Sequence, residues 1–458
     1  MEAVFLEKLT LADIIKAVGG RQESGADCEI TEVSTDTRDI SKGSLFIPIR
    51  GERFDGHDFV AKAFEAGAAA VLADRDIKGK CVVRVSDTRK AYLDLAGWYR
   101  RRFPVTVVGI TGSVGKTTTK EMVAAVLESR YKTLKTEGNF NNEIGLPRTL
   151  LRLDSSYQTA VIEMGMSHFG EISRLAKAAA PNIGVIANIG VSHIENLGSR
   201  EGILKAKLEI LDGMDEHAPL LLNSDNDLLS KAADELEREI ITYGIDSPHA
   251  DIRAVNIQET GLTTEFDIVF YGKKAHTVLP AIGKHNVLNA LAAFAVGLIN
   301  DVDPQAAVAA LEQYTPAGMR QRIVDRRGMM VIEDCYNASP DSMLAALHAL
   351  SAVGCTGRRI AVLSDMLELG SYSVRAHYDV GRAVAQSKAD LLFCTGTDAA
   401  YIVKGAGEAG MDNAMFYPQR DDLVRAVRET VRPGDCLLFK ASRGMKLEEL
   451  MEKICGES

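Results

Sequence analysis

Residues 105–130, VTVVGITGSVGKTTTKEMVAAVLESR, constrain the fold more than any other stretch of the chain. An apolar, strand-like run ends in a turn with three glycines, and a helix-like segment begins at Lys116. Glycines let the backbone turn tightly and point N–H groups at an anion, and the dipole of the following helix adds to that field. This order of strand, loop and helix predicts a phosphate-binding loop in an α/β domain.

The loop also predicts which side chains contact a nucleoside triphosphate. We expect Lys116 to reach the β- and γ-phosphates and the Thr117 hydroxyl to bind Mg²⁺. Ile110 stands where the strict pattern has its first glycine, so a glycine-rich turn with an incidental lysine is the alternative interpretation. The predicted nucleotide-binding loop consists of Gly112, Ser113, Val114, Gly115, Lys116, Thr117 and Thr118.

Two further residues follow the next strand-like runs. Glu163 ends the run TAVIE, and His193 comes shortly after VIANIG. Because the carboxyl ends of parallel strands meet at one edge of a sheet, both residues are expected near the phosphate loop. A carboxylate there is suited to a metal ion, whereas a lone histidine is more often structural. Their shared position favours a metal site.

Residues 199–214, SREGILKAKLEILDGM, are expected to form one helix with Lys207 on its apolar side. At about 100° per residue, the apolar side chains spread over one broad arc, and Lys205, Glu209 and Asp212 share the opposite, solvated face. Burying an ammonium is costly unless the charge is paired or removed. Either the amine of Lys207 extends back to solvent, or it points into the site as an ion pair or as a metal-binding carbamate.

Composition and charge narrow the class of protein. The net charge of −10 argues against a general binder of nucleic acid or anionic membranes. Seven scattered cysteines without a C-x-x-C motif indicate reduced thiols, and no signal peptide or membrane span is recognisable. We therefore expect a soluble, cytoplasmic protein. The sequence also lacks the N-K-x-D motif of GTPases and the apolar run ending in Asp-Glu of motor ATPases.

The 458 residues predict about three domains, with boundaries at 1–85, 86–315 and 316–458. In the central part, apolar strands alternate with amphipathic helices, which is typical of a parallel sheet. The pattern starts again near YTPAGMRQRIV and predicts a second, Rossmann-like α/β unit. The expected strands are 105–110, 159–164, 183–189 and 220–223, and then 330–334, 359–364, 391–395 and 437–441.

Eleven motifs follow one another along the chain: STDTR (34–38), GERFDGHDF (51–59), GITGSVGKTTTKEM (109–122), GNFNNEIGLPRTLL (138–151), EMGMSHFGEI (163–172), NIGVSHIENLGS (188–199), AKLEIL (206–211), GKHNVLNALAA (283–293), CYNASPDSM (335–343), SDMLELG (364–370) and SRGMKLE (442–448). In this order they resemble the Mur ligases, the ATP-dependent amide-bond-forming enzymes of bacterial peptidoglycan synthesis. The sequence departs from the family pattern at Ser364 and Ala441, where glycine is usual. Both replacements are small, so we expect altered loop detail and the same reaction.

The resemblance implies a reaction and its substrates. The signatures YNASPDSM and DMLELG, without a D-[DN]-P-R tetrapeptide, are similar to the branch that joins D-alanyl-D-alanine to a UDP-linked muramoyl tripeptide through an acyl phosphate. A sister ligase that adds the third amino acid, or a folylpolyglutamate synthase-like enzyme, is the first alternative. A P-loop protein that binds nucleotide to switch a partner is the second. A monomer that closes on its substrates is expected.

The resemblance also implies roles for residues. Lys116 steadies the transferred phosphoryl group, Thr117 and Glu163 hold one Mg²⁺, and His193 with carbamylated Lys207 holds a second. Asn286 and Asn289 contact adenine, and His285 either joins them or only starts a helix. Read without the resemblance, STDTR is equally an ordinary turn. The remaining implied contacts are Arg320, Asp334 and Asn337 for the nucleotide; Ser34, Thr35, Asp36, Arg38, Asp55, Gly56 and His57 for the UDP end; and Ser442 and Arg443 for the dipeptide or acceptor carboxylate.

Overall fold

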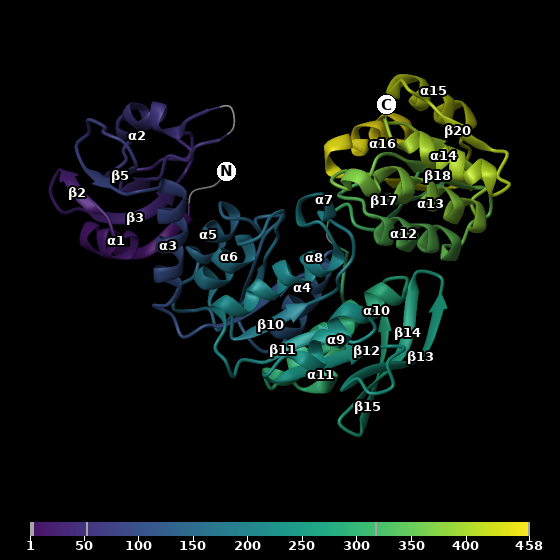
Figure 1. The fold of residues 1–458 in the computed structure, drawn as a ribbon, viewed down its shortest axis with the longest axis horizontal. Helices are drawn as coiled ribbons and strands as arrows, with labels where there is room; N and C mark the ends of the chain where they lie inside the picture. Colours follow the sequence, from purple (N-terminus) through teal and green to yellow (C-terminus); the bar gives the residue numbers. More distant parts are fainter. Residues whose placement is uncertain (1–3, 52–53, 317, 457–458) are drawn as a thin grey trace. The chain divides into compact units, whose positions relative to one another are not determined.

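The computed structural model describes residues 4–51, 54–316 and 318–456. Glu52 and Arg53 of the GERFDGHDF motif, and Ala317 at the predicted joint, lie outside the described residues. The chain forms two compact units. Unit 1 consists of Met1–Thr111, Arg130–Val185 and Lys207–Leu220, and unit 2 of Gly112–Ser129, Ile186–Ala206 and Leu221–Ser458. The described residues form three separate sheets, which confirms the expected α/β class (Figure 1).

The N-terminal sheet belongs to unit 1. Its elements are β1 (Val4–Thr10), α1 (Leu11–Val18), β2 (Arg21–Ser24), β3 (Glu29–Ser34), β4 (Ser44–Phe46), the 3₁₀ helix η1 (Gly56–Phe59), α2 (Val60–Ala66), β5 (Ala70–Ala73) and β6 (Val82–Arg84). The strand order is β1-β3-β4-β5-β6-β2, with β3 to β6 parallel and the two edge strands antiparallel. α1 begins where Thr10 and Asp13 form a capping box and ends at Gly19, which has φ +59°.

The middle sheet has nine strands in the order β15-β14-β13-β12-β11-β10-β7-β9-β8. The strands are β7 (Thr106–Thr111), β8 (Thr133–Lys135), β9 (Thr159–Glu163), β10 (Ile183–Ile186), β11 (Leu220–Asn223), β12 (Ile240–Gly244), β13 (Ile252–Thr260), β14 (Thr263–Phe270) and β15 (Lys273–Leu279). The helices are α3 (Thr88–Arg100), α4 (Lys116–Glu128), α5 (Gly145–Leu150), α6 (Glu171–Ala179), α7 (Ile194–Leu197), α8 (Arg200–Leu208), the 3₁₀ helix η2 (Glu209–Gly213), α9 (Asp227–Glu235), α10 (Lys284–Ile299) and α11 (Pro304–Glu312).

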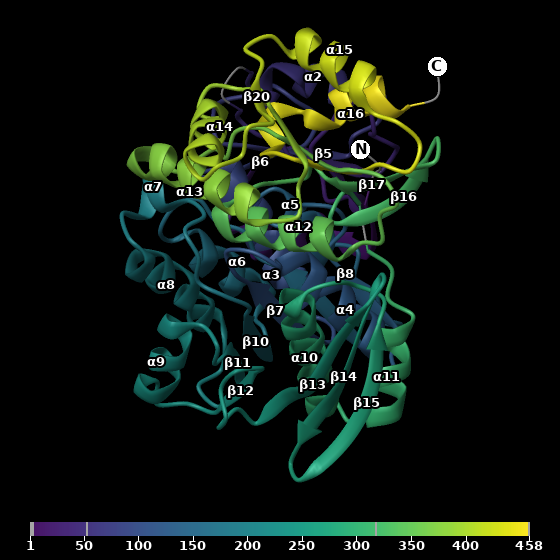
Figure 2. The same cartoon turned by 90° about the vertical axis from the view of Figure 1, so that its right-hand side faces the viewer.

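The sequence did not predict the antiparallel ribbon at one end of this sheet. β13, β14 and β15 pair antiparallel, and α10 packs against β12 and β13 (Figure 2). β15 alternates between exposed and buried residues from Lys274 onward, as in a strand with one face toward water. The expected parallel sheet is therefore a mixed one, with parallel pairs at β7–β9, β8–β9 and β12–β13.

The C-terminal sheet lies wholly in unit 2. Its elements are β16 (Arg322–Arg326), β17 (Met329–Asp334), α12 (Pro340–Ala352), β18 (Arg359–Leu363), the 3₁₀ helix η3 (Gly370–Tyr372), α13 (Ser373–Gln386), β19 (Leu391–Cys394), α14 (Ala399–Glu408), β20 (Ala414–Phe416), α15 (Arg420–Thr430), β21 (Cys436–Lys440), the 3₁₀ helix η4 (Arg443–Met445) and α16 (Leu447–Cys455). The order is β16-β17-β21-β18-β19-β20, and the five strands from β17 to β20 are parallel.

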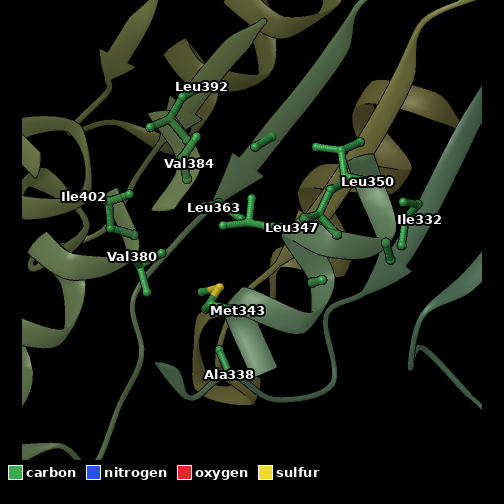
Figure 3. Packing of buried hydrophobic residues seen from close by; sticks show 14 of the residues in the cluster. Ile332, Ala338, Met343, Leu347, Leu350, Leu363, Val380, Val384, Leu392 and Ile402 are labelled. Carbon is green, nitrogen blue, oxygen red and sulfur yellow. The ribbon is translucent and has the colours of Figure 1, made fainter. Parts of the chain in front are cut away.

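Alternating strand residues divide the C-terminal core into two layers. In β21, Leu438 faces the layer that contains α12, α13 and α14, whereas its neighbours Leu437 and Phe439 face the layer that contains α15 and α16. Leu347 and Leu363 lie in the first layer (Figure 3). A strand that is apolar on both faces requires helices on both sides. This arrangement leaves the carboxyl ends of the strands open for function.

The predicted helix over 199–214 is interrupted. α8 ends at Leu208, and η2 follows it as a 3₁₀ helix. Glu209, expected on a solvated face, instead accepts hydrogen bonds from the backbone N–H groups of Gly170 (2.7 and 2.9 Å) and Ser173 (3.3 Å) at the start of α6. A tertiary contact to a helix N-terminus therefore overrides the local periodicity.

Candidate active site

The predicted phosphate loop is present, and it is braced from inside unit 2. The side-chain oxygen of Asn188 accepts from the backbone N–H groups of Ser113 (3.0 Å) and Val114 (2.9 Å). The Ser113 hydroxyl in turn accepts from the N–H of Gly190 at 3.0 Å. These bonds fix the loop before α4 begins, so its remaining N–H groups are oriented without rearrangement.

Lys116 occupies the first position of α4, with Gly115 as the helix cap at φ +84°. Its amine donates to the carbonyl of Gly112 at 2.8 Å, so the side chain curls over the loop. Thr117 is buried in the next position, at 6% exposure. A lysine folded over a glycine loop is the arrangement that places a cation against bound phosphates.

Two asparagines of α10 stand beside this loop. Asn289 accepts from the Thr119 hydroxyl at 3.0 Å, and a Cβ on Gly115 would lie 2.8 Å from its Oδ1 atom. Asn286 is 3.5 Å from Asn289 and donates to the Gln321 side chain at 3.4 Å. The structure therefore brings both asparagines together and links them to the segment that precedes β16.

Gln321 also connects to His285. The ring Nε2 of His285 lies 3.1 Å from Gln321 Oε1. Burial lowers the pKa of His285 to about 4, so the ring is neutral at pH 7. A neutral ring then donates its Nε2 proton to Gln321. His285 thus does more than begin α10.

The ends of β17 and β21 carry a buried ion pair. Asp334 and Lys440 are partners in the strand register, and the Lys440 amine lies 2.7 Å from Asp334 Oδ2. Burial raises the pKa of Asp334, and the charge of Lys440 opposes this. Lys440 also donates to the carbonyl of Asn337 at 3.0 Å. The carboxylate, the amine and the Asn337 loop form one unit at the sheet edge.

Arg320 and Arg443 share an aromatic neighbour. The guanidinium of Arg320 lies 3.8 Å from the ring centroid of Tyr336, and that of Arg443 lies 5.9 Å away. Cations stack on such rings at these distances. Arg443 also pairs with Glu448 at 2.8 Å. Tyr336 therefore holds two predicted anion-binding side chains at the same edge.

Ser442 takes a different position from Arg443. Its hydroxyl accepts from the N–H of Leu367 at 2.9 Å, and the residue is 3% exposed. Its own N–H donates to the carbonyl of Asp365 at 3.1 Å. Ser442 ties together the loops that follow β18 and β21, while the exposed side chain of Arg443 is the one available to a substrate.

His193 adopts a left-handed backbone conformation, with φ +64°, at the start of α7. Its Nδ1 atom lies 2.7 Å from a carboxylate oxygen of Glu368, within the DMLELG motif. Imidazole nitrogen is a poorer ligand for Mg²⁺ than oxygen, so the donor chemistry favours a metal role less here than at Glu163.

Glu163 and Lys207 lie in unit 1. Glu163 ends β9 at 1% exposure, and Asn141 of the GNFNN motif donates to its Oε1 atom at 2.7 Å. Its backbone N–H donates to the Thr136 hydroxyl at 3.0 Å. Lys207 is 2% exposed in α8, which confirms its predicted burial. An amine so thoroughly buried does not extend back to solvent.

The metal prediction rests on donor chemistry alone. No cluster of three or more His, Cys, Asp or Glu side chains with metal-binding geometry is found within residues 4–51, 54–316 and 318–456. The Thr117 hydroxyl and the Glu163 carboxylate are the oxygen ligands that Mg²⁺ prefers. Thr117 belongs to unit 2 and Glu163 to unit 1, so each is a single oxygen donor within its own unit.

The STDTR motif folds as a self-bonded turn at the end of β3. The Ser34 hydroxyl accepts from the N–H of Asp36 at 3.0 Å, and Asp36 accepts from the N–H of Arg38 at 3.0 Å. The side-chain hydrogen bond from Arg38 is the largest cause that lowers the pKa of Asp36, to about 2. The Arg38 side chain is 77% exposed, so its guanidinium faces solvent from a fixed base.

The Asp55 loop lies next to this turn in unit 1. Ile47 donates to the Ser34 carbonyl at 2.9 Å, and Gly56 donates to the Ile49 carbonyl at 3.1 Å. The His57 ring is fully buried, with Nδ1 2.6 Å from Asp55. Burial raises the pKa of Asp55, but the bonds from His57 outweigh it and lower the pKa to about 2. The buried His57 ring therefore holds the Asp55 side chain in place.

Several residues of this site were not predicted as functional. Asn188, Asn141 and Gln321 each orient a predicted residue through a side-chain amide. Asn188 lies in the motif NIGVSHIENLGS and Asn141 in GNFNNEIGLPRTLL, so the motifs already marked both segments. Lys440 could not be recognised in the sequence. A lysine at the end of an apolar strand can be exposed or buried, and only its partner in the fold shows which.

Comparison with known proteins decides the family. Three family profiles match consecutive parts of the chain: the "Mur ligase family, catalytic domain" over 29–107, the "Mur ligase middle domain" over 110–297, and the "Mur ligase, glutamate ligase domain" over 319–443. The UDP-N-acetylmuramoyl-tripeptide–D-alanyl-D-alanine ligase of Bacillus subtilis is 43% identical over 428 residues, which cover 92% of each chain. The chain belongs to the Mur ligase family.

Solved structures agree with this assignment. A crystal structure of MurF from Acinetobacter baumannii matches with a TM-score of 0.93 at 31% identity, over 99% of this chain and 100% of that one. MurF ligase from Thermotoga maritima in complex with ADP matches with a TM-score of 0.83 at 28% identity, over 92% and 96%. The resemblance found in the motifs is confirmed, and it extends through the three α/β domains.

Proposed function

We propose that this Mur ligase joins D-alanyl-D-alanine to UDP-N-acetylmuramoyl-tripeptide at the expense of ATP, in peptidoglycan synthesis. The observation that carries the proposal is the full-length similarity to the Bacillus ligase, at 43% identity over 92% of both chains. A phosphate loop braced by Asn188 supplies the nucleotide site that such a reaction needs. A sister ligase would not account for a match of this length and identity.

The chemistry explains why a phosphate loop belongs in an amide-forming enzyme. A carboxylate is a poor electrophile at neutral pH, so the terminal carboxylate of the tripeptide first attacks the γ-phosphorus of ATP. ADP leaves, and an acyl phosphate forms. The dipeptide amine then attacks the acyl carbon, a tetrahedral intermediate collapses, and phosphate departs with one former carboxylate oxygen. The protein positions the reactants and neutralises charge.

Two groups of residues in unit 2 contact the nucleotide: the phosphate loop with the asparagines of α10, and the residues around Asp334. Lys116 neutralises the transferred phosphoryl group, and the N–H groups of 112–118 hold the phosphates. Asn286 and Asn289 bind adenine, while Arg320, Asp334 and Asn337 bind the phosphates and ribose. The neutral His285 orients Asn286 through Gln321. ATP binding by this site is supported by the ADP complex of the Thermotoga protein.

Thr117 and Glu163 would hold one Mg²⁺, which would offset phosphate charge. Asn141 keeps the Glu163 carboxylate oriented. The amine of Lys207 adds to CO₂ and loses a proton, giving a carbamate anion that no longer imposes a buried cation. This anion and His193 would hold a second metal ion.

The UDP end of the nucleotide-sugar substrate binds at the turn formed by Ser34, Thr35, Asp36 and Arg38 and at the loop Asp55-Gly56-His57. Arg38 supplies the exposed cation, and His57 holds Asp55 in place. Arg443 meets the acceptor side of the reaction, with Ser442 fixing the loop from which it projects.

The domains correspond to residues 1–85, 86–315 and 316–458, and the enzyme acts as a cytoplasmic monomer that closes on its substrates. Within the part of the chain that the structure describes, no helix combines the length and apolarity needed to cross a bilayer.

Phosphate release in the presence of ATP, Mg²⁺ and UDP-muramoyl tripeptide tests the proposal. Release that depends on D-alanyl-D-alanine, with a pentapeptide product identified by mass, is the expected result. Release that responds to a single amino acid instead assigns the chain to a sister ligase. Nucleotide binding with no acceptor-dependent release indicates a nucleotide switch.

A further inference from the structure

A buried histidine beside the C-terminal sheet lies outside the residues of the candidate active site. His377, on α13, is 0% exposed. The same face of the helix carries Val380 and Val384, which both pack in the core (Figure 3). A polar ring among apolar side chains is costly unless its nitrogen atoms are hydrogen-bonded. The partners of the two nitrogens therefore show what this ring does.

Both ring nitrogens of His377 have a backbone partner. The Nε2 atom accepts from the N–H of Met366 at 2.9 Å. A backbone N–H can only donate, so Nε2 carries no proton and the neutral ring has its proton on Nδ1. Nδ1 lies 2.8 Å from the carbonyl oxygen of Ser373, one turn earlier in α13, and donates to it. The two partners thus select one tautomer and fix the plane of the ring.

Met366 belongs to the loop that follows β18, and its neighbours in that loop bond Ser442. The carbonyl of Asp365 accepts from the Ser442 N–H at 3.1 Å, and the N–H of Leu367 donates to the Ser442 hydroxyl at 2.9 Å. These two groups flank Met366, so the position of the Met366 backbone determines both bonds. The ring of His377 therefore holds the peptide segment to which Ser442 is bonded.

The first two residues of this loop are held by segments at the ends of the neighbouring strands. The N–H of Ser364 donates to the Lys440 carbonyl at 3.1 Å. The Ser364 hydroxyl bonds the Thr395 carbonyl, a contact that the glycine usual in the family cannot make. The Asp365 carboxylate accepts from the N–H of Thr397 at 2.8 Å. The third residue of the loop is the one that the ring on α13 holds.

Ser442 directly precedes Arg443, which meets the acceptor side of the proposed reaction. Ser442 is buried at 3% exposure, whereas the Arg443 side chain is 58% exposed and begins the short helix η4. The backbone at Ser442 therefore determines where the Arg443 side chain starts. Such support matters, because a small displacement of a group that binds a reactant lowers the rate.

We propose that His377 is a positioning residue for the acceptor step. Through the backbone of Met366 it holds Ser442, and through Ser442 it sets the direction in which Arg443 projects from the sheet edge. The inference rests on the proposed function, in which Arg443 meets the dipeptide. His377 itself touches neither substrate, because its ring is buried.

Two substitutions that differ by one carbon atom test this proposal. The glutamine amide reaches as far as Nε2, so His377→Gln retains an acceptor for the Met366 N–H. The shorter asparagine reaches only the Nδ1 position, so His377→Asn loses that acceptor. Acceptor-dependent phosphate release is measured against dipeptide concentration at saturating ATP and UDP-muramoyl tripeptide, and then against ATP concentration. His377→Asn should raise KM for the dipeptide about ten-fold and leave KM for ATP unchanged, whereas His377→Gln should stay within about three-fold of the wild type for both.

The same substitution at an exposed histidine is the control. The His348 side chain on α12 is 52% exposed, and His348→Asn should leave KM for the dipeptide unchanged. A purely structural role for His377 would reduce the amount of folded enzyme, which lowers kcat without changing KM. Equal effects of His377→Gln and His377→Asn, or an unchanged KM for the dipeptide in His377→Asn, therefore overturn the proposal.

Ser442→Ala completes a double-mutant cycle along the same path. Because His377 acts through Ser442, the double variant His377→Asn/Ser442→Ala should raise KM for the dipeptide by less than the product of the two single effects. Single effects that multiply fully overturn the path through Ser442. A wild-type enzyme without dipeptide-dependent release overturns the proposed function itself, so the two failures are distinguishable.

Discussion

Lys207 is almost completely buried in α8, although a lysine amine is ordinarily charged at neutral pH. Conversion to a carbamate replaces a buried cation by an anion that a metal ion can bind. Lys207→Ala is therefore expected to lower kcat by about 100-fold or more, and short carboxylic acids such as acetate should restore part of the rate. Phosphate release with and without added acid measures both effects.

Lys205→Ala is the matched control, because Lys205 lies on the same helix with an exposed side chain. We expect its rate to stay near that of the wild type and not to respond to acetate. A Lys207→Ala enzyme with intact activity, or one that no carboxylic acid improves, contradicts the carbamate assignment.

His285 gives the folded protein a defined response to acid. Its pKa of about 4 in the folded state lies below the value of about 6.5 for an exposed histidine. The unfolded state therefore binds the proton first, so the stabilisation is complete above pH 6.5 and is lost as the pH falls toward 4. Urea unfolding at pH 7 and at pH 4.5 measures how much the free energy of unfolding falls in acid. In His285→Gln this fall should be about 2–3 kcal/mol smaller than in the wild type.

His217→Gln serves as the comparison for this measurement, because the His217 side chain is 89% exposed. Its unfolding free energy should follow the wild type at both pH values. Identical pH dependence in the wild type and His285→Gln would show that the buried ring does not titrate as described.

At the scale of elements, the turn between β7 and α4 depends on the backbone freedom of Gly115. Its φ of +84° disfavours any side chain, and a Cβ would also lie 2.8 Å from Asn289 Oδ1. Gly115→Ala is expected to weaken ADP binding by at least about ten-fold, through the loop and through the proposed adenine contact of Asn289. Isothermal titration with ADP and Mg²⁺ measures this loss.

Gly198→Ala is a suitable control for the same residue change. Gly198 also has a positive φ, of +80°, but a Cβ there meets no atom within 4 Å. The Gly198→Ala variant should have a lower free energy of unfolding and the same affinity for ADP as the wild type. Equal ADP affinity in Gly115→Ala and the wild type would separate this turn from the nucleotide site.

Helices, strands and turns could be predicted from the sequence where residues within one segment determine them, and not where contacts with distant segments do. The phosphate loop and the burial of Lys207 follow from residue types and periodicity within one segment, and both are confirmed. The end of α8 was predicted wrongly, because Glu209 is recruited by the N-terminus of α6. The β13–β15 ribbon was missed as well, since its exposed face gives a weak apolar pattern.

The same limit applied to the residues of the candidate active site. Motif residues such as Lys116 and Asn289 were identified because the family pattern marks them. The residues that orient them, such as Gln321 and Asn188, act through contacts between segments distant in sequence.

At the scale of the whole molecule, the domains together perform one reaction with a distinctive fate for each oxygen atom. If the tripeptide carboxylate attacks ATP, one of its two oxygens becomes the bridge of the acyl phosphate. The attack of the dipeptide amine then expels that oxygen with the departing phosphate. The other carboxylate oxygen stays in the new amide.

The most direct measurement uses UDP-muramoyl tripeptide labelled with ¹⁸O in its terminal carboxylate, together with ATP, Mg²⁺ and D-alanyl-D-alanine. Mass spectrometry of the products should find one ¹⁸O in the released phosphate and one in the pentapeptide amide. Unlabelled phosphate, released with or without the dipeptide, would contradict the assignment of this chain as a ligase that works through an acyl phosphate.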